Sequence, residues 1–131
     1  TSDVGGTGTT AVDILTTTVT AKTTTALIMY DVSIYLHNTD TANSQNIHMD
    51  VRILIDGATV KSSFFNGMAP APPDTYFYHV DTITYLKTDF TAGTTYEIKL
   101  QGYGNQSYAE WGIDASSKPS YYHCELIVLW L

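Results

Sequence analysis

Apolar and polar positions alternate along residues 47–55, which predicts a β-strand with one buried face. The apolar positions share one side of that strand: Met49, Val51, Ile53 and Ile55. The polar positions share the other side: His48, Asp50 and Arg52. Asp56-Gly57 follows directly, and glycine accepts the positive φ that a tight hairpin turn requires. We therefore expect a β-hairpin whose return strand starts at Thr59.

A second alternating stretch covers residues 26–37 and predicts a long strand. Its apolar positions share one face: Ile28, Tyr30, Val32, Ile34 and Leu36. Its polar positions share the opposite face: Asp31, Ser33 and His37. Residues 38–46 are built from turn-forming residues, so they are expected to form a polar loop between this strand and the hairpin.

Further stretches rich in aromatic and β-branched residues predict more strands: 75–86, 96–101, 108–114 and 121–131. The threonine-dense residues 11–25 suit one or two short strands, because β-branched side chains resist helix. Residues 91–94 are expected to turn the chain, and the glycines of residues 102–106 to break a strand. Residues 64–74 hold three of the four prolines, so we expect an irregular crossing there.

No stretch shows sustained helical periodicity. Seven or eight strands, separated by turns every eight to twelve residues, point to an all-β sandwich or barrel. At 131 residues the chain is expected to form one domain with a real core. Residues 1–10 are rich in Gly and Thr and lack an apolar face. We expect a flexible or extended arm over residues 1–12 and the β-domain over residues 13–131.

Composition limits the partners of this protein. Six Lys and Arg against thirteen Asp and Glu give a net charge of −7, and there is no basic cluster. A nucleic-acid site that follows phosphates is therefore not expected, nor is docking on an anionic membrane. Cys124 is the only cysteine, so an internal disulfide is excluded, and its apolar neighbours suggest a small buried filler.

Three segments share their order and spacing with a known family: VRILIDGATV (51–60), ITYLKTDFTAGTTYEIKLQGY (83–103) and CELIVLWL (124–131). Together they resemble the jelly rolls of the tumour necrosis factor and complement globular-head type, most closely the versions in bacteriophage virion proteins. The resemblance spans residues 26–131. It implies an antiparallel jelly-roll β-sandwich of about eight to ten strands, usually a trimer, that binds partners or builds particles. It brings no catalytic residue.

The resemblance leads to three functional hypotheses. The first is a trimeric capsid decoration or cement protein, which would bind the major capsid protein or another virion protein and stabilise the lattice. It would assemble in the host cytoplasm and reside on the capsid surface. The second is a receptor-binding knob of a tail fibre or spike that recognises host glycan or protein. The third is a secreted cytokine-like ligand.

The closing stretch favours assembly independently, because both faces of residues 126–131 are apolar. A strand with water on one side should alternate, so a continuous apolar run indicates cover on both sides. One face can meet the core, and a second subunit can cover the other, although a loop of the same chain remains an alternative. The expected subunit interface comprises Tyr122, Cys124, Ile127, Leu129, Trp130 and Leu131.

Two further sets of residues are candidates for partner binding. The first would bind the capsid from the arm and its junction: Val4, Val12 and Ile14. The second joins aromatic and amide side chains in a loop-prone stretch, as recognition sites do: Tyr103, Asn105, Tyr108 and Trp111. For the tyrosines the alternative is ordinary packing on a sheet, with the hydroxyls at its rim.

Three histidine-x-acid pairs are the remaining chemical candidates: His48/Asp50, His79/Asp81 and His123/Glu125. Residues two apart on a strand lie on one face, so each pair could share a site, and three copies about a threefold axis could bind an ion. Such pairs also serve solubility and cross-strand contacts, and no established ligand spacing is present. We therefore expect no metal, no cofactor and no enzymatic activity.

Overall fold

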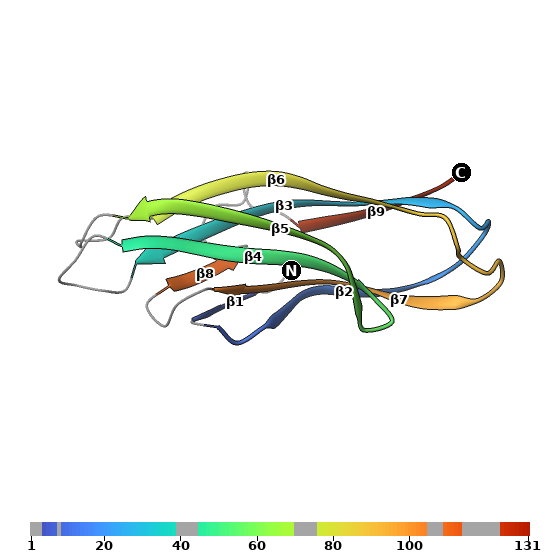
Figure 1. Cartoon of the computed structure of the whole chain (residues 1–131), viewed down its shortest axis with the longest axis horizontal. Helices are drawn as coiled ribbons and strands as arrows, with labels where there is room; N and C mark the ends of the chain where they lie inside the picture. The colour runs from blue at the N-terminus through green and yellow to red at the C-terminus, as the bar shows by residue number, and fades with distance from the viewer. Residues whose placement is uncertain (1–3, 8, 39–44, 70–75, 105–108, 114–123) are drawn as a thin grey trace.

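The computed structural model describes residues 4–7, 9–38, 45–69, 76–104, 109–113 and 124–131. These residues form nine strands and no helix, which confirms the all-β prediction. The strands are β1 (Val4–Thr7), β2 (Val12–Thr20), β3 (Ala26–Asn38), β4 (Gln45–Ile55), β5 (Ala58–Ala69), β6 (Tyr76–Lys87), β7 (Thr95–Gly104), β8 (Ala109–Ile113) and β9 (Cys124–Trp130). They run roughly along the long axis of an elongated molecule (Figure 1).

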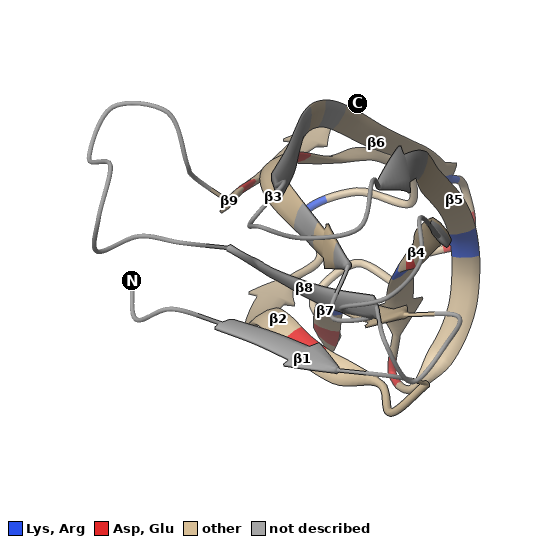
Figure 2. Ribbon diagram, turned by 90° about the vertical axis from the view of Figure 1, so that its left-hand side faces the viewer, with Lys and Arg blue, Asp and Glu red and all other residues tan. Residues whose placement is uncertain are grey.

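The strands form two antiparallel sheets. One has the order β1-β8-β3-β6, with β9 also paired to β3, and we call it sheet A. The other has the order β2-β7-β4-β5, and we call it sheet B. The sheets face each other as a β-sandwich (Figure 2). Strands β1 to β4 alternate between the sheets, so neighbours within a sheet are mostly distant in sequence.

Strands β8 and β9 share one edge of β3. Strand β8 pairs with residues 35–38 of β3, whereas β9 pairs with residues 26–32. Both run antiparallel to β3, so they follow one another along the same edge. Strand β1 pairs with β8, with Val4 opposite Ile113. This arrangement places β9 in the surface formed by β3 and β6.

The predicted hairpin is confirmed as β4 and β5. Asp56 has a φ of 48° and Gly57 a φ of 81°, as a tight hairpin turn requires. The turn is also tied to β7, because the Asp56 amide donates to the Glu97 carbonyl at 2.9 Å. In return the Glu97 amide donates to Asp56 Oδ1 at 2.8 Å. A shift of register occurs between Ile53 and Leu54, and three consecutive side chains are buried there, Ile53, Leu54 and Ile55, which strict alternation does not predict.

Three expectations were wrong in detail. Residues 64–69 were expected to be irregular but belong to β5, because they pair with β4. Gly102 and Gly104 were expected to break a strand but continue β7 and are buried beside β4. Ser33 was expected on the polar face of its strand but is 1% exposed. Cross-strand pairing decided the first two cases, and it is not visible in a local pattern. The proline-containing residues 70–75 lie outside the described residues.

The core lies between the sheets and follows the alternation. Side chains with no exposed surface include Ile28, Tyr30, Val32 and Ile34 of β3, Met49, Val51 and Ile53 of β4, and Ile98 and Leu100 of β7. Phe90 closes one end of the core from the turn between β6 and β7, and is 2% exposed. The turn predicted at residues 91–94 is confirmed, with Gly93 at a φ of 83° and the Thr94 amide donating to the Thr91 carbonyl.

Candidate functional site

Strand β9 presents one apolar face to the core and the other to solvent. Leu126, Val128 and Trp130 are partly buried against the core. The intervening side chains are exposed large hydrophobics: Ile127 at 42%, Leu129 at 50% and Leu131 at 60%. The apolar run predicted at this end of the chain therefore leaves a hydrophobic face uncovered by any described part of the same chain.

The register of sheet A extends this face over three strands. Leu129 lies opposite Leu27 of β3, and Leu27 in turn lies opposite Leu86 of β6, which is 51% exposed. Ile127 lies opposite Met29, the next outward position of β3. We define the apolar patch by these side chains: Leu27, Met29, Leu86, Ile127, Leu129 and Leu131. Large contiguous apolar patches occur preferentially at interaction sites of proteins.

A polar row borders the apolar patch along the strands. Asp31 of β3 lies between Glu125 of β9 and Thr82 of β6. The Thr82 hydroxyl donates to Asp31 Oδ1 at 3.4 Å. The sheet thus presents an apolar area edged by carboxylates and hydroxyls, which is the usual anatomy of a protein interface.

The proposed subunit-interface residues occupy different faces of sheet A. Ile127, Leu129 and Leu131 belong to the apolar patch. Cys124 and Trp130 lie on the core side of β9. Burial raises the pKa of the Cys124 thiol to about 12, and the nearby charge of Asp31 adds to the rise. Tyr122 lies outside the described residues.

The proposed arm residues lie within the two sheets. Val4 is in β1, opposite Ile113 of β8. Val12 and Ile14 are in β2, where Val12 packs against the core and Ile14 is 8% exposed within it. Ile14 is therefore not accessible to a partner while β2 is folded.

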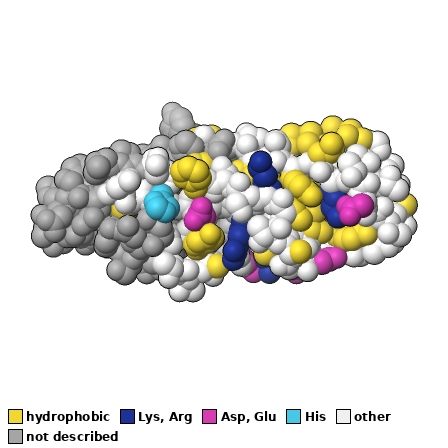
Figure 3. All heavy atoms as spheres, viewed as in Figure 1, with side chains coloured by type: hydrophobic (Ala, Val, Ile, Leu, Met, Phe, Trp, Pro, Cys, Tyr) yellow, Lys and Arg dark blue, Asp and Glu magenta, His cyan; other side chains and the backbone are white. Residues whose placement is uncertain are grey.

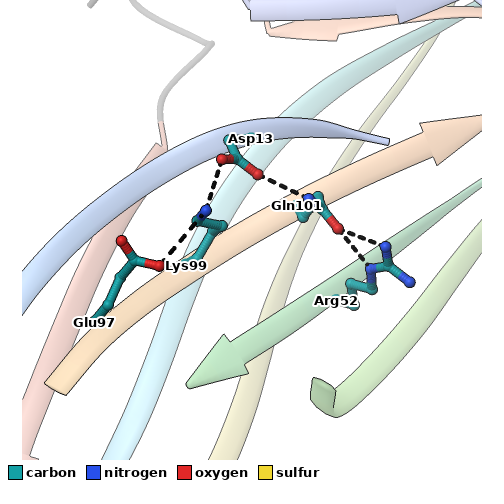
Figure 4. Close-up of polar contacts among 5 residues, drawn as sticks. All are labelled: Asp13, Arg52, Glu97, Lys99 and Gln101. Atoms are coloured by element: carbon teal, nitrogen blue, oxygen red, sulfur yellow. Dashed lines mark hydrogen bonds and ion pairs between the residues drawn. The ribbon is translucent and has the colours of Figure 1, made fainter. Parts of the chain in front are cut away.

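The outer face of sheet B carries a connected set of polar side chains (Figure 4). Lys99 of β7 forms ion pairs with Asp13 at 2.8 Å and with Glu97 at 3.6 Å. Gln101 Nε2 donates to Asp13 Oδ1 at 2.8 Å, and Arg52 Nε donates to Gln101 Oε1 at 2.8 Å. The hydrogen bond that Lys99 donates to Asp13 lowers the pKa of Asp13 and raises the pKa of Lys99.

Two aromatic side chains flank Asp50 next to this set. Asp50 of β4 lies opposite Phe64 of β5 on one side and opposite Tyr103 of β7 on the other. Phe64 is 66% exposed, and the Arg52 guanidinium lies 5.0 Å from the centroid of the Tyr103 ring. Burial raises the pKa of Tyr103, and Asp50 adds to the rise through its charge and a hydrogen bond. In the view of Figure 3, hydrophobic, acidic, basic and histidine side chains are interspersed on the surface.

The proposed recognition set is divided by the structure. Tyr103 lies in strand β7 and not in a loop. Trp111 lies in β8, opposite Leu36, and only its strand position is described. Asn105 and Tyr108 lie outside the described residues. The sequence interpretation missed Phe64, because that residue was assigned to an irregular segment. Residues 62–66 read Ser-Ser-Phe-Phe-Asn and do not alternate, so no local pattern marks Phe64 as an outward strand position.

Only part of the histidine-x-acid hypothesis falls on described side chains. His48 and Asp50 share the outer face of β4, as predicted. The side chains of His79, Asp81 and His123 lie outside the described set. Among the described residues, no group of three or more His, Cys, Asp or Glu side chains is placed to hold a metal ion. The described part of the chain also has no helix with the length and hydrophobicity of a membrane-spanning segment.

Comparison with known proteins adds no relative. A scan against protein-family models found no match, and searches of curated proteins and of solved structures found none either.

Proposed function

We propose that this protein is a trimeric jelly-roll structural protein of a bacteriophage virion, which decorates the capsid and stabilises its lattice. The apolar patch on sheet A carries the proposal, because it is the surface through which copies would associate. The strand orders β1-β8-β3-β6 and β2-β7-β4-β5 support the jelly roll. In that fold, consecutive strands cross between two facing sheets, as β1 to β4 do here.

The energetics of the apolar patch favour a protein partner. Fully burying one leucine or isoleucine side chain contributes about 1.5–3 kcal/mol. Ile127, Leu129 and Leu131 are 42–60% exposed in the single chain. Burying each of them in an interface would therefore contribute roughly half of that free energy. Three copies packed about a threefold axis bring these side chains together, while the row of Asp31 and Glu125 stays at the rim. The resemblance to trimeric jelly rolls selects the trimer among closed assemblies.

Native mass spectrometry tests the assembly. We expect three copies of the 14.4 kDa chain, and we expect Leu129→Lys to yield monomers, because a charge would then be buried in the interface. Thr18→Lys is the matched control, since Thr18 is exposed on the outer face of sheet B. A monomeric wild-type chain, or a trimer that survives Leu129→Lys, would contradict the proposal.

The virion role needs a separate experiment. Particles produced without this protein should release their DNA at a lower temperature than complete particles, and adding the purified trimer should restore the difference. The Leu129→Lys protein is expected not to restore it. Identical release temperatures with and without the protein would rule out a cementing role.

A further inference from the structure

The outer face of sheet B carries an exposed aromatic side chain, Phe64. Phe64 is 66% exposed and projects from β5, whereas its outward neighbours on the same strand are Ser62 and Asn66. Asp50 lies beside it on β4 and Tyr103 one strand further on β7. Neighbouring strands are about 4.8 Å apart, so the Phe64 and Tyr103 positions are separated by about 10 Å across the sheet. Two rings thus flank a carboxylate on one rigid surface.

The next row along the strands supplies fixed hydrogen-bonding groups. Arg52, Gln101 and Asp13 lie side by side on β4, β7 and β2 and are joined by hydrogen bonds of 2.8 Å. The Arg52 guanidinium carries five N–H donors. Gln101 Oε1 accepts one hydrogen bond from Nε and one from Nη2. The carboxylate oxygens of Asp13 and Asp50 have several acceptor sites each. Because these groups hold one another in place, their side chains would lose little conformational entropy when a ligand binds.

We propose that this surface binds a neutral oligosaccharide. A pyranose ring has an apolar face of C–H groups and an edge of hydroxyls, each of which donates and accepts. Phe64 would stack against the apolar face of one sugar unit, and the Tyr103 ring, which already holds the Arg52 guanidinium 5.0 Å from its centroid, would contact a second unit. Asp50 and Arg52 would bind hydroxyls between them, one as acceptor and the other as donor.

The charge on this face selects neutral sugars. Among the described residues of this outer face, Asp13, Asp50 and Glu97 carry three negative charges against two positive charges on Arg52 and Lys99, and the whole chain carries a net charge of −7. Sulfated or carboxylated glycans would therefore be repelled. The site lies on sheet B and the apolar patch on sheet A, so the inference does not depend on the proposed assembly.

Saturation-transfer NMR with the full-length protein tests the inference. The probes are the neutral tetrasaccharides cellotetraose, maltotetraose and tetra-N-acetylchitotetraose, together with a sulfated heparin tetrasaccharide. We expect at least one neutral probe to bind and the sulfated probe to bind more weakly. Phe64→Ala should weaken the neutral interaction by fivefold or more. Val80→Ala is the matched control, since Val80 is an exposed hydrophobic of sheet A at 63%, and it should leave binding unchanged.

Three results would overturn sugar binding at this surface. Absence of binding by all three neutral probes would overturn the inference, as would a preference for the sulfated probe. Equal affinities for the wild type and the Phe64→Ala variant would place any sugar site elsewhere and overturn it too. Circular dichroism and native mass spectrometry of the Phe64→Ala protein should match the wild type, because Phe64 is outside both the core and the apolar patch.

Discussion

Phe90 and Trp130 pack edge to face, with ring centroids 5.3 Å apart and ring planes at 63°. Phe90 is in contact with Tyr96 in the same manner at 4.7 Å. Trp130 is the last residue of β9 and fixes the inward face of this strand to the core of the same chain. The outward face of β9, which carries Leu129, is available for other contacts.

The two faces of β9 should respond differently to truncation. Trp130→Ala is expected to lower the free energy of unfolding by about 3 kcal/mol, near the lower end for a large aromatic side chain because Trp130 is only partly buried. Leu129→Ala is expected to change the stability of the monomeric chain by less than about 1 kcal/mol, since the side chain is 50% exposed. Urea unfolding at concentrations that give monomers measures both. Equal losses for the two variants would contradict the assignment of faces.

The β4–β5 turn should be sensitive to side chains that resist positive φ. Gly57 has a φ of 81°, and open space surrounds the position where a Cβ would be added. Gly57→Ala is therefore expected to lower the free energy of unfolding by about 1–2 kcal/mol through backbone strain alone. Gly57→Asn should cost less, since asparagine tolerates this region better. Thermal unfolding of both variants checks the order, and a more stable alanine variant would contradict it.

The ion pair of Asp13 and Lys99 should make the free energy of unfolding slightly dependent on pH in the acid range. The hydrogen bond from Lys99 lowers the pKa of Asp13 below its ordinary value of 3.8. A lowered pKa contributes stability that is present above the ordinary value and is lost as the pH falls through the folded-state value. Both side chains are solvent-exposed enough for screening to keep the effect small. The urea midpoint of the wild type should fall more between pH 5 and pH 2.5 than that of Asp13→Asn, and parallel curves would refute the link.

The only thiol of the chain should be nearly unreactive in the folded protein. Burial raises the pKa of Cys124 to about 12, so the thiolate fraction at pH 8 is smaller by about a thousandfold than for an ordinary thiol. Reaction with a chromogenic disulfide should therefore be slower by at least two orders of magnitude in buffer than in 8 M urea. Comparable rates in the two solvents would show that β9 exposes its inward face.

Local pattern was sufficient for much of the fold. The alternation in residues 47–55 and the Asp56-Gly57 turn predicted the β4–β5 hairpin, because both depend on neighbours within the segment. The continuous apolar run of residues 126–131 also predicted that both faces of β9 are apolar, as the structure shows. It could not say which face points inward, since period two is symmetric, and the expected interface therefore combined Trp130 with Leu129.

The candidate surfaces depend on contacts between distant segments. Leu27, Leu86 and Leu129 are far apart in sequence and become neighbours only because β3 pairs with both β6 and β9. Phe64, Asp50 and Tyr103 likewise meet only through the registers of β4 with β5 and β7. The sequence by itself determined most of the strands and their apolar sides, because side-chain alternation is a property of one extended chain. Only the tertiary structure decided which sides became surfaces and which residues meet there, because sheet order and register are set by long-range pairing that leaves no local signal.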